Sequence, residues 1–196
     1  ADNKFTWIVG LNGCKAVLIA PTWVLTAAHC IDHIFNFNRG RVFYSSKDPV
    51  TGVMTSGSQD TGLNSAFKHP YFRLGFPDND IALVRLPKPF APDALLQAAE
   101  LPVAAAAVGQ QGTVANFSHT TTLPAGQVGV LPAPILFAGG KSFTARSTTA
   151  SLCPGDSGSG FMTLRAGLNV VTGIASQAVV SDCAAPNLEF DAVDVF

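Results

Sequence analysis

The segment Thr26-Ala27-Ala28-His29-Cys30 decides the fold when it is taken with two later segments, Asp78-Asn79-Asp80-Ile81-Ala82-Leu83 and Gly155-Asp156-Ser157-Gly158-Ser159-Gly160. Each segment alone is ambiguous. A histidine at the end of an apolar strand is usually structural, an aspartate before a strand usually belongs to a turn, and a Gly-Asp-Ser-Gly run usually forms a loop. Together they supply an imidazole, a carboxylate and a serine hydroxyl, which are the groups that nucleophilic catalysis requires.

The three side chains have complementary chemistry. A serine hydroxyl is a weak nucleophile at neutral pH and needs an adjacent general base, and the pKa of histidine suits that role. The base in turn needs a carboxylate that fixes its tautomer and stabilises the imidazolium. Gly155 and Gly158 flank Ser157, so the backbone can turn sharply there and present amide N–H groups to a developing oxyanion. We expect His29 to be the base, Asp80 its partner and Ser157 the nucleophile.

These segments resemble the TAAHC, DIAL and GDSG signatures of the trypsin/chymotrypsin family of serine proteases, and the chain order His29, Asp80, Ser157 is the chymotrypsin order. The resemblance implies a serine endopeptidase that hydrolyses peptide bonds through an acyl-enzyme, with the amides of Gly155 and Ser157 as the oxyanion hole. It also implies an all-β fold of two packed six-stranded antiparallel β-barrels, with the active site in the cleft between them. This chemistry requires no cofactor, and the expected partners are protein or peptide substrates.

The cysteine pattern points to disulfides once the resemblance is considered. Four cysteines are present, an even number without any C-x-x-C spacing. By count alone, two disulfides in an oxidising compartment and four buried thiols in the cytosol are equally compatible. The resemblance implies the pairs Cys14–Cys30 and Cys153–Cys183, and therefore a secreted protein.

The pattern outside the motifs is that of an all-β protein. Short apolar or alternating runs are separated by Gly, Pro, Asn, Asp and Ser, which is typical of a sandwich or barrel. The only candidate helices are a single turn over Ala27–Ile31 and a segment over Asp93–Glu100. The proline-rich stretch Leu86–Pro92 interrupts any strand, so we expect an N-terminal barrel over residues 1–90 and a C-terminal barrel over residues 91–196. The expected strands cover Phe5–Val9, Lys15–Ala20, Trp23–Thr26, Arg41–Tyr44, Ile81–Leu86, Gly112–Phe117, Gln127–Val130, Gly160–Leu164 and Val170–Ala175.

Composition argues against several other classes of protein. Charged residues make up 13% of the chain and the net charge is −1, without a basic cluster of the kind that nucleic-acid binding needs. No uninterrupted apolar stretch is long enough to cross a membrane. We therefore expect neither nucleic acid nor a membrane as a partner. We also expect the protein to be a monomer.

His29, Cys30 and His33 lie close in sequence, but no partner pair completes a zinc site, so no metal is expected. His33, His69 and His119 are expected in solvated loops or turns.

The resemblance also indicates where the substrate pocket lies. Its base corresponds to Ser151, where trypsins carry an aspartate that pairs with a basic substrate side chain. Serine lacks that charge, so an uncharged side chain of small or medium size is expected. The strand that lines the pocket ends in Ser176, Gln177 and Ala178 instead of the family's Ser-Trp-Gly. Asn187 or Glu189 is also expected near the pocket, and an inward-pointing Glu189 would allow a basic side chain.

One departure from the family concerns the aspartate before the nucleophile. In most members a new N-terminal amine pairs with this residue, here Asp156. We expect residues 7–9 to form the first inner strand, which leaves no activating terminus. The charge of Asp156 must then be stabilised in another way. The alternatives are a different cation, such as Lys15 or His119, a set of hydrogen bonds, or exposure to solvent. Two alternatives to an active endopeptidase therefore stay open. One is a catalytically silent, protease-like binding protein with an unformed oxyanion hole, and the other is an esterase with the same triad.

Overall fold

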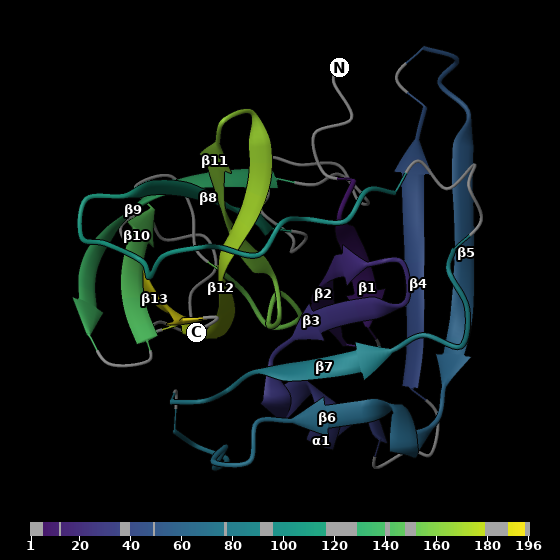
Figure 1. Ribbon diagram of the computed structural model, residues 1–196, viewed down its shortest axis with the longest axis horizontal. Coiled ribbons are helices and arrows are strands. Elements are labelled where there is room, and N and C mark those ends of the chain that lie inside the picture. Colours follow the sequence, from purple (N-terminus) through teal and green to yellow (C-terminus); the bar gives the residue numbers. More distant parts are fainter. Residues whose placement is uncertain are drawn as a thin grey trace.

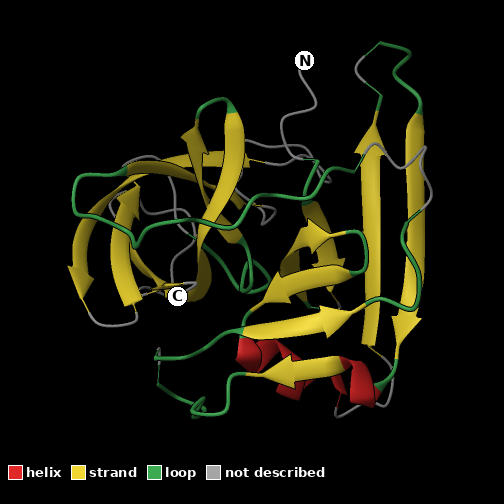
Figure 2. Ribbon diagram, in the orientation of Figure 1, coloured by secondary structure: helices red, strands yellow, loops and turns green. Residues whose placement is uncertain are grey.

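The computed structural model describes residues 6–11, 13–35, 40–48, 50–76, 78–90, 96–116, 129–139, 142–147, 152–178 and 188–194. Over these residues the chain forms two antiparallel sheets that lie side by side, one from each half of the sequence (Figure 1). Among the described residues, helix is confined to one α-helix and one 3-10 turn next to the N-terminal sheet (Figure 2). Among the described helices, none combines the length and the apolar character that crossing a membrane demands.

The N-terminal sheet is antiparallel and combines hairpins with pairings between strands that are distant in sequence, namely β1 with β4 and β3 with β7. Because β5 and β6 lie at opposite edges of the sheet and only residues 62–65 separate them, the sheet must curl until its edges approach each other; four residues span about 14 Å at most. Its described strands, in the spatial order β5-β4-β1-β2-β3-β7-β6, are β1 (Ile8–Leu11), β2 (Cys14–Ala20), β3 (Trp23–Thr26), β4 (Gly40–Lys47), β5 (Met54–Thr61), β6 (Ala66–Lys68) and β7 (Ala82–Arg85).

The pairing of β3 with β7 positions the first two candidate residues. The strands run antiparallel, and Thr26 at the end of β3 lies opposite Ala82 at the start of β7. His29 follows β3 directly, in the first turn of α1 (Ala28–Phe35), and Asp80 precedes β7 by two residues. The register of one strand pair therefore brings together two residues that are 51 positions apart in the sequence.

The C-terminal sheet closes on itself as a barrel. Closure leaves no edge strand, which removes unpaired backbone groups that would otherwise need covering. The register of β12 shifts against β13 between Ala175 and Gln177, and a shift of this kind re-aims side chains at the end of a strand. The described strands, in the order β10-β13-β12-β11-β8-β9, are β8 (Gln111–Asn116), β9 (Gly129–Gly139), β10 (Ser142–Ser147), β11 (Gly160–Arg165), β12 (Leu168–Ala178) and β13 (Leu188–Asp194).

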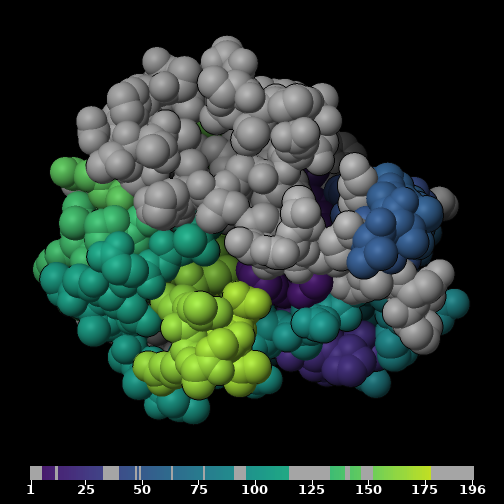
Figure 3. Space-filling view, turned by 90° about the horizontal axis from the view of Figure 1, so that it is seen from above, coloured from purple at the N-terminus to yellow at the C-terminus, as the bar shows by residue number. Residues whose placement is uncertain are grey.

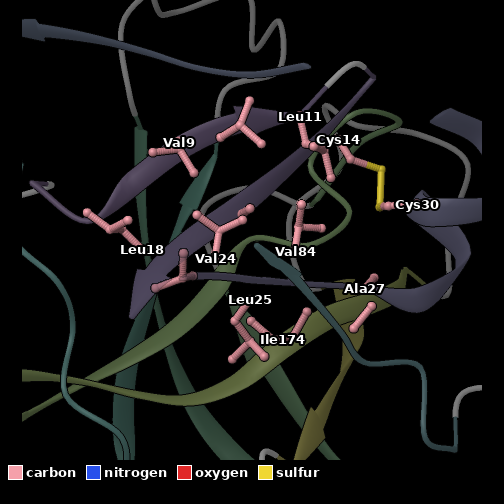
Figure 4. Packing of buried hydrophobic residues seen from close by; sticks show 14 of the residues in the cluster. Val9, Leu11, Cys14, Leu18, Val24, Leu25, Ala27, Cys30, Val84 and Ile174 are labelled. Atoms are coloured by element: carbon pink, nitrogen blue, oxygen red, sulfur yellow. A yellow bond between two sulfur atoms is a disulfide. The ribbon is translucent and has the colours of Figure 1, made fainter. Parts of the chain in front are cut away.

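The two sheets share part of their core. The N-terminal cluster of buried side chains includes Met162, Val171 and Ile174, which belong to the C-terminal barrel. Ile174 lies beside Leu25 and the backbone of β3 (Figure 4). A second cluster, centred on Phe143 and Phe161, fills the C-terminal barrel itself. In the space-filling view, the yellow-green atoms of β11 and β12 adjoin purple and teal atoms of neighbouring segments (Figure 3). The barrels are thus fixed against each other by apolar packing, which a site between them requires.

The predicted all-β, two-barrel fold is confirmed, with differences in detail. The described N-terminal sheet has seven strands where six were expected, because the 3-10 turn Leu63–Ser65 divides β5 from β6. The turn expected at Ala27–Ile31 extends to an eight-residue helix. No helix forms over residues 96–100 of the expected Asp93–Glu100 segment; Glu100 instead bridges to Val170 of β12. The division at residue 90 stays a prediction.

Candidate active site

The best-defined element of the site is the pair formed by His29 and Asp80. His29 Nδ1 lies 2.6 Å from Asp80 Oδ2, and the His29 backbone N–H donates to Asp80 Oδ1 at 2.8 Å. The Asp80 side chain is 3% exposed and that of His29 is 20% exposed. Because an ionised carboxylate only accepts hydrogen bonds, the ring proton sits on Nδ1, and Nε2 is left as an acceptor.

A third residue supports this carboxylate from the other barrel. Ser176, on β12, donates from Oγ to Asp80 Oδ2 at 2.6 Å, and its side chain is buried. The sequence placed Ser176 in the substrate pocket but did not predict this contact with Asp80. Asp80 therefore receives hydrogen bonds from both halves of the chain, which satisfies a buried charge and holds the barrels in register at the site.

Ser157 lies in a loop that packs against the inner strands of the N-terminal sheet. We call residues 153–158, which contain the predicted nucleophile, the nucleophile loop. The backbone N–H of Lys15 on β2 donates to the carbonyl of Ser157 at 2.8 Å, and the N–H of Gly158 donates to the carbonyl of Ala175 on β12 at 2.9 Å. The loop is thus held between β2 and β12, next to the strand that leads into His29.

Gly158 is required by its surroundings. Its φ is +83°, and a Cβ at this position would lie 2.1 Å from the Lys15 carbonyl oxygen and 2.4 Å from Thr26 Oγ1. Thr26 Oγ1 also donates to that carbonyl at 2.7 Å. The loop therefore approaches β2 more closely than any residue with a side chain would allow.

The loop leaves two amides open. Within the described part of the chain, no hydrogen bond engages the N–H groups of Gly155 and Ser157, so both are available to an incoming anion. Gly155 has a φ of +97°, a conformation that favours glycine. Among the same residues, no hydrogen bond joins Ser157 Oγ to His29; Nε2 lies 3.7 Å from Cys30 Sγ instead. In enzymes without bound substrate, the hydrogen bond between a catalytic serine and its histidine is often long.

Asp156 is fully buried at the base of this loop. Its Oδ2 accepts from the N–H of Cys153 at 3.0 Å, and its own N–H donates to the carbonyl of Cys153 at 2.9 Å. Lys15 lies close enough that the negative charge of Asp156 acts to raise the pKa of the lysine, although burial outweighs this and lowers it. Of the two cations named from the sequence, Lys15 thus lies near Asp156; His119 is outside the described residues, and so is Ala1.

The disulfide prediction is confirmed for one pair. Cys14 and Cys30 are bonded, which ties the start of β2 to the first turn of α1. Cys153 is also disulfide-bonded, whereas Cys183, the partner that the resemblance implies, lies outside the described residues. The sulfurs of Cys14 and Cys30 lie near His29 in an arrangement that resembles a metal site, but sulfurs bonded to each other are not thiolate ligands.

The structure locates only part of the predicted substrate pocket. Gln177 follows Ser176 on β12 and its side chain is exposed, while Ala178 ends the strand opposite Phe190 of β13. Ser151 and Asn187 lie outside the described residues. The pocket assignment therefore stays a prediction.

Comparison with known proteins gives one consistent result. A family model described as Trypsin matches residues 1–193. Among similar proteins, trypsin of Squalus acanthias is 29% identical over 132 residues (65% of this chain, 54% of that protein), and trypsin-1 of Salmo salar is 28% identical over 150 residues (74% and 59%). The suppressor of tumorigenicity 14 protein homolog of Bos taurus is 32% identical over 118 residues, 53% of this chain and 13% of that protein. The matched region spans little more than half the length of these two trypsins.

Proposed function

This chain belongs to the trypsin family of serine proteases, and we propose that it is a secreted, monomeric endopeptidase in which His29, Asp80 and Ser157 form the catalytic triad. The observation that carries the proposal is the double hydrogen bond from His29 to Asp80. It fixes the imidazole through both its ring and its backbone, which is the arrangement a general base needs. Secretion is supported by the Cys14–Cys30 disulfide, because such bonds persist in oxidising compartments.

Acylation follows from the state of the histidine ring. With Nδ1–H donated to Asp80, Nε2 accepts the hydroxyl proton of Ser157 as Oγ attacks the scissile carbonyl carbon. The carbonyl oxygen becomes an oxyanion, and the amides of Gly155 and Ser157 stabilise it. The imidazolium, stabilised by the Asp80 carboxylate, then gives its proton to the leaving amine, and the acyl-enzyme ester remains on Ser157.

Deacylation reverses the roles of the same groups. His29 accepts a proton from water, the hydroxide attacks the ester carbonyl, and the oxyanion again lies against the amides of Gly155 and Ser157. Collapse of this second intermediate returns the proton to Ser157 Oγ and releases the carboxylic acid. The buried hydrogen bond from Ser176 helps to keep Asp80 oriented through both steps.

The proposed substrates are proteins and peptides with an uncharged residue of small or medium size at the cleaved position. Ser151, the proposed pocket base, is a neutral hydroxyl. Placing a lysine or arginine side chain there without a partner would be costly. Gln177 in place of the family's tryptophan removes an apolar surface next to the pocket.

A silent binding protein is the competing proposal, because Ser157 and His29 are not hydrogen-bonded to each other among the described residues. Labelling with a fluorophosphonate separates the two, since only an activated serine beside a formed oxyanion hole reacts quickly. An active enzyme incorporates the probe at Ser157, and His29→Ala abolishes the reaction. A folded protein that remains unlabelled at Ser157 would support the binding protein and contradict the enzyme.

A further inference from the structure

We propose that Lys15 is a positioning residue that holds the nucleophile loop in the conformation that presents the amides of Gly155 and Ser157 to an oxyanion. The inference rests on the proposed function and adds to it the group that orders the oxyanion hole. Lys15 reaches the loop from β2, a strand of the other barrel, 140 positions earlier in the sequence.

Lys15 contacts the loop at two points on either side of Asp156. Its side-chain Nζ donates to the carbonyl of Gly155 at 3.2 Å, and its backbone N–H donates to the carbonyl of Ser157 at 2.8 Å. The Gly155 and Ser157 amides themselves have no hydrogen-bond partner among the described residues. The side-chain contact fixes the peptide plane between Gly155 and Asp156, and the backbone contact fixes the plane between Ser157 and Gly158. The Ser157 amide lies in the plane between these two and the Gly155 amide lies in the plane just before the first, so both amides are oriented by neighbouring planes that Lys15 holds.

The charge of Lys15 matters as well as its hydrogen bonds. Asp156 is fully buried, and a buried carboxylate is stabilised by hydrogen bonds and by a nearby positive charge. The half-buried ammonium of Lys15 supplies that charge from the neighbouring strand. Removing it would leave Asp156 less compensated and would favour turning the carboxylate out of the core, which would rotate the adjacent Gly155 and Ser157 amides out of place.

The position of Lys15 is itself fixed. The neighbouring residue Cys14 is disulfide-bonded to Cys30. The backbone carbonyl of Lys15 accepts a hydrogen bond from Thr26 Oγ1 at 2.7 Å. The backbone of β2 cannot move away from the loop without disturbing these contacts, which also border His29. Strand β2 therefore holds the cation against the nucleophile loop, and the Cys14–Cys30 disulfide ties this strand to the helix that carries His29.

The pH dependence of activity gives a signature of this role. Burial lowers the pKa of Lys15 below its usual value of 10.5, against the opposing attraction of Asp156. In the part of the chain that the structure describes, the neighbouring strands β1 and β3 carry no titratable side chain, and Asp156 is the charged group that acts on Lys15. The His29–Asp80 pair lies where β3 ends and β7 begins. As the pH rises towards 10.5, Lys15 loses its charge and activity should fall.

This loss of activity at alkaline pH can be distinguished from unfolding of the protein. The unfolded chain holds the Lys15 proton more tightly than the folded chain, so this titration alone increases the free energy of unfolding as the pH rises. Activity controlled by Lys15 should therefore decline while the protein remains folded. A guanidinium stays charged throughout this range, so Lys15→Arg should move the alkaline limb to higher pH.

The test compares Lys15→Met, Lys15→Arg and a control, Lys88→Met, in which an exposed lysine away from the site is changed in the same way. Rates of fluorophosphonate labelling and kcat and KM for a peptide substrate are measured across pH, with thermal unfolding of each variant. Lys15→Met should lower the labelling rate and kcat on the order of 10²-fold, the effect of losing one oxyanion donor, with a smaller change in KM. Lys15→Arg should recover most of the rate, and Lys88→Met should match the parent.

The outcomes separate the two proposals. If the parent protein is not labelled, the proposed function fails, and the role of Lys15 fails with it. If the parent is labelled and Lys15→Met reacts equally fast, only the positioning role is wrong. If Lys15→Met does not fold, the pH profile of Lys15→Arg decides, and an alkaline limb unchanged from the parent overturns the inference.

Discussion

Ser176 Oγ lies 2.6 Å from Asp80 Oδ2, so a strand of the C-terminal barrel stabilises the carboxylate that the N-terminal sheet places behind His29. The two residues are 96 positions apart. The contact makes the proposed triad depend on the docking of the barrels, not on either barrel alone. It also explains why a small polar residue stands at this buried position.

Replacing Ser176 with Ala should slow catalysis without unfolding the protein. A hydrogen bond to a charged group contributes about 1.5–3 kcal/mol, so kcat/KM should fall roughly 10- to 100-fold. Ser159→Ala is the matched control, because the Ser159 hydroxyl is buried without a hydrogen-bond partner within the described part of the chain. Equal activity of the two variants in a peptide hydrolysis assay would show that the Ser176 hydroxyl is dispensable.

Gly158 should tolerate no side chain. Alanine would have to adopt a φ of +83° and place its Cβ 2.1 Å from a backbone oxygen of β2, so the nucleophile loop would have to move. We expect Gly158→Ala to lose both labelling at Ser157 and thermal stability. Gly167→Ala is the control, since its φ is +81° with nothing within 4 Å of the added Cβ. Similar losses in both variants would mean that backbone strain alone, and not the close approach to β2, is responsible.

The disulfides give a prediction for stability. Cys14 and Cys30 are separated by 16 positions, and closing a loop of about this length contributes on the order of 3 kcal/mol. The double variant Cys14→Ala/Cys30→Ala should therefore lose about that much free energy of unfolding in denaturant titrations. Thiol titration of the denatured, unreduced parent should find no free cysteine; four reactive thiols would refute both disulfides.

The specificity prediction concerns the residue on the acyl side of the cleaved bond. Ser151 lacks the negative charge that a lysine or arginine side chain would need, so cleavage should favour small or medium uncharged residues. Digestion of a peptide library, read by mass spectrometry, measures the preference. Cleavage mainly after Lys and Arg would contradict the prediction and would point to Glu189. Ser151→Asp should shift the preference towards those residues.

The sequence was most informative where a short motif carries its own chemistry. The segments around His29, Asp80 and Ser157 predicted the fold through their resemblance to one protease family. They also included His29 and Asp80, which the structure joins by hydrogen bonds. Strand β5 (Met54–Thr61) was missed, since its residues are small and polar and only pairing with β4 makes it a strand. The contacts of Ser176 and Lys15 with residues distant in sequence depend on how the barrels dock, which no local pattern encodes.

The most direct measurement of the central claim is the turnover of a peptide substrate by the parent and by Ser157→Ala. If Ser157 is the nucleophile that the His29–Asp80 pair activates, the substitution should lower kcat by about 10⁴-fold or more with the fold unchanged, as judged by thermal unfolding. A Ser157→Ala protein that hydrolyses the peptide at close to the parent rate would contradict the proposed mechanism.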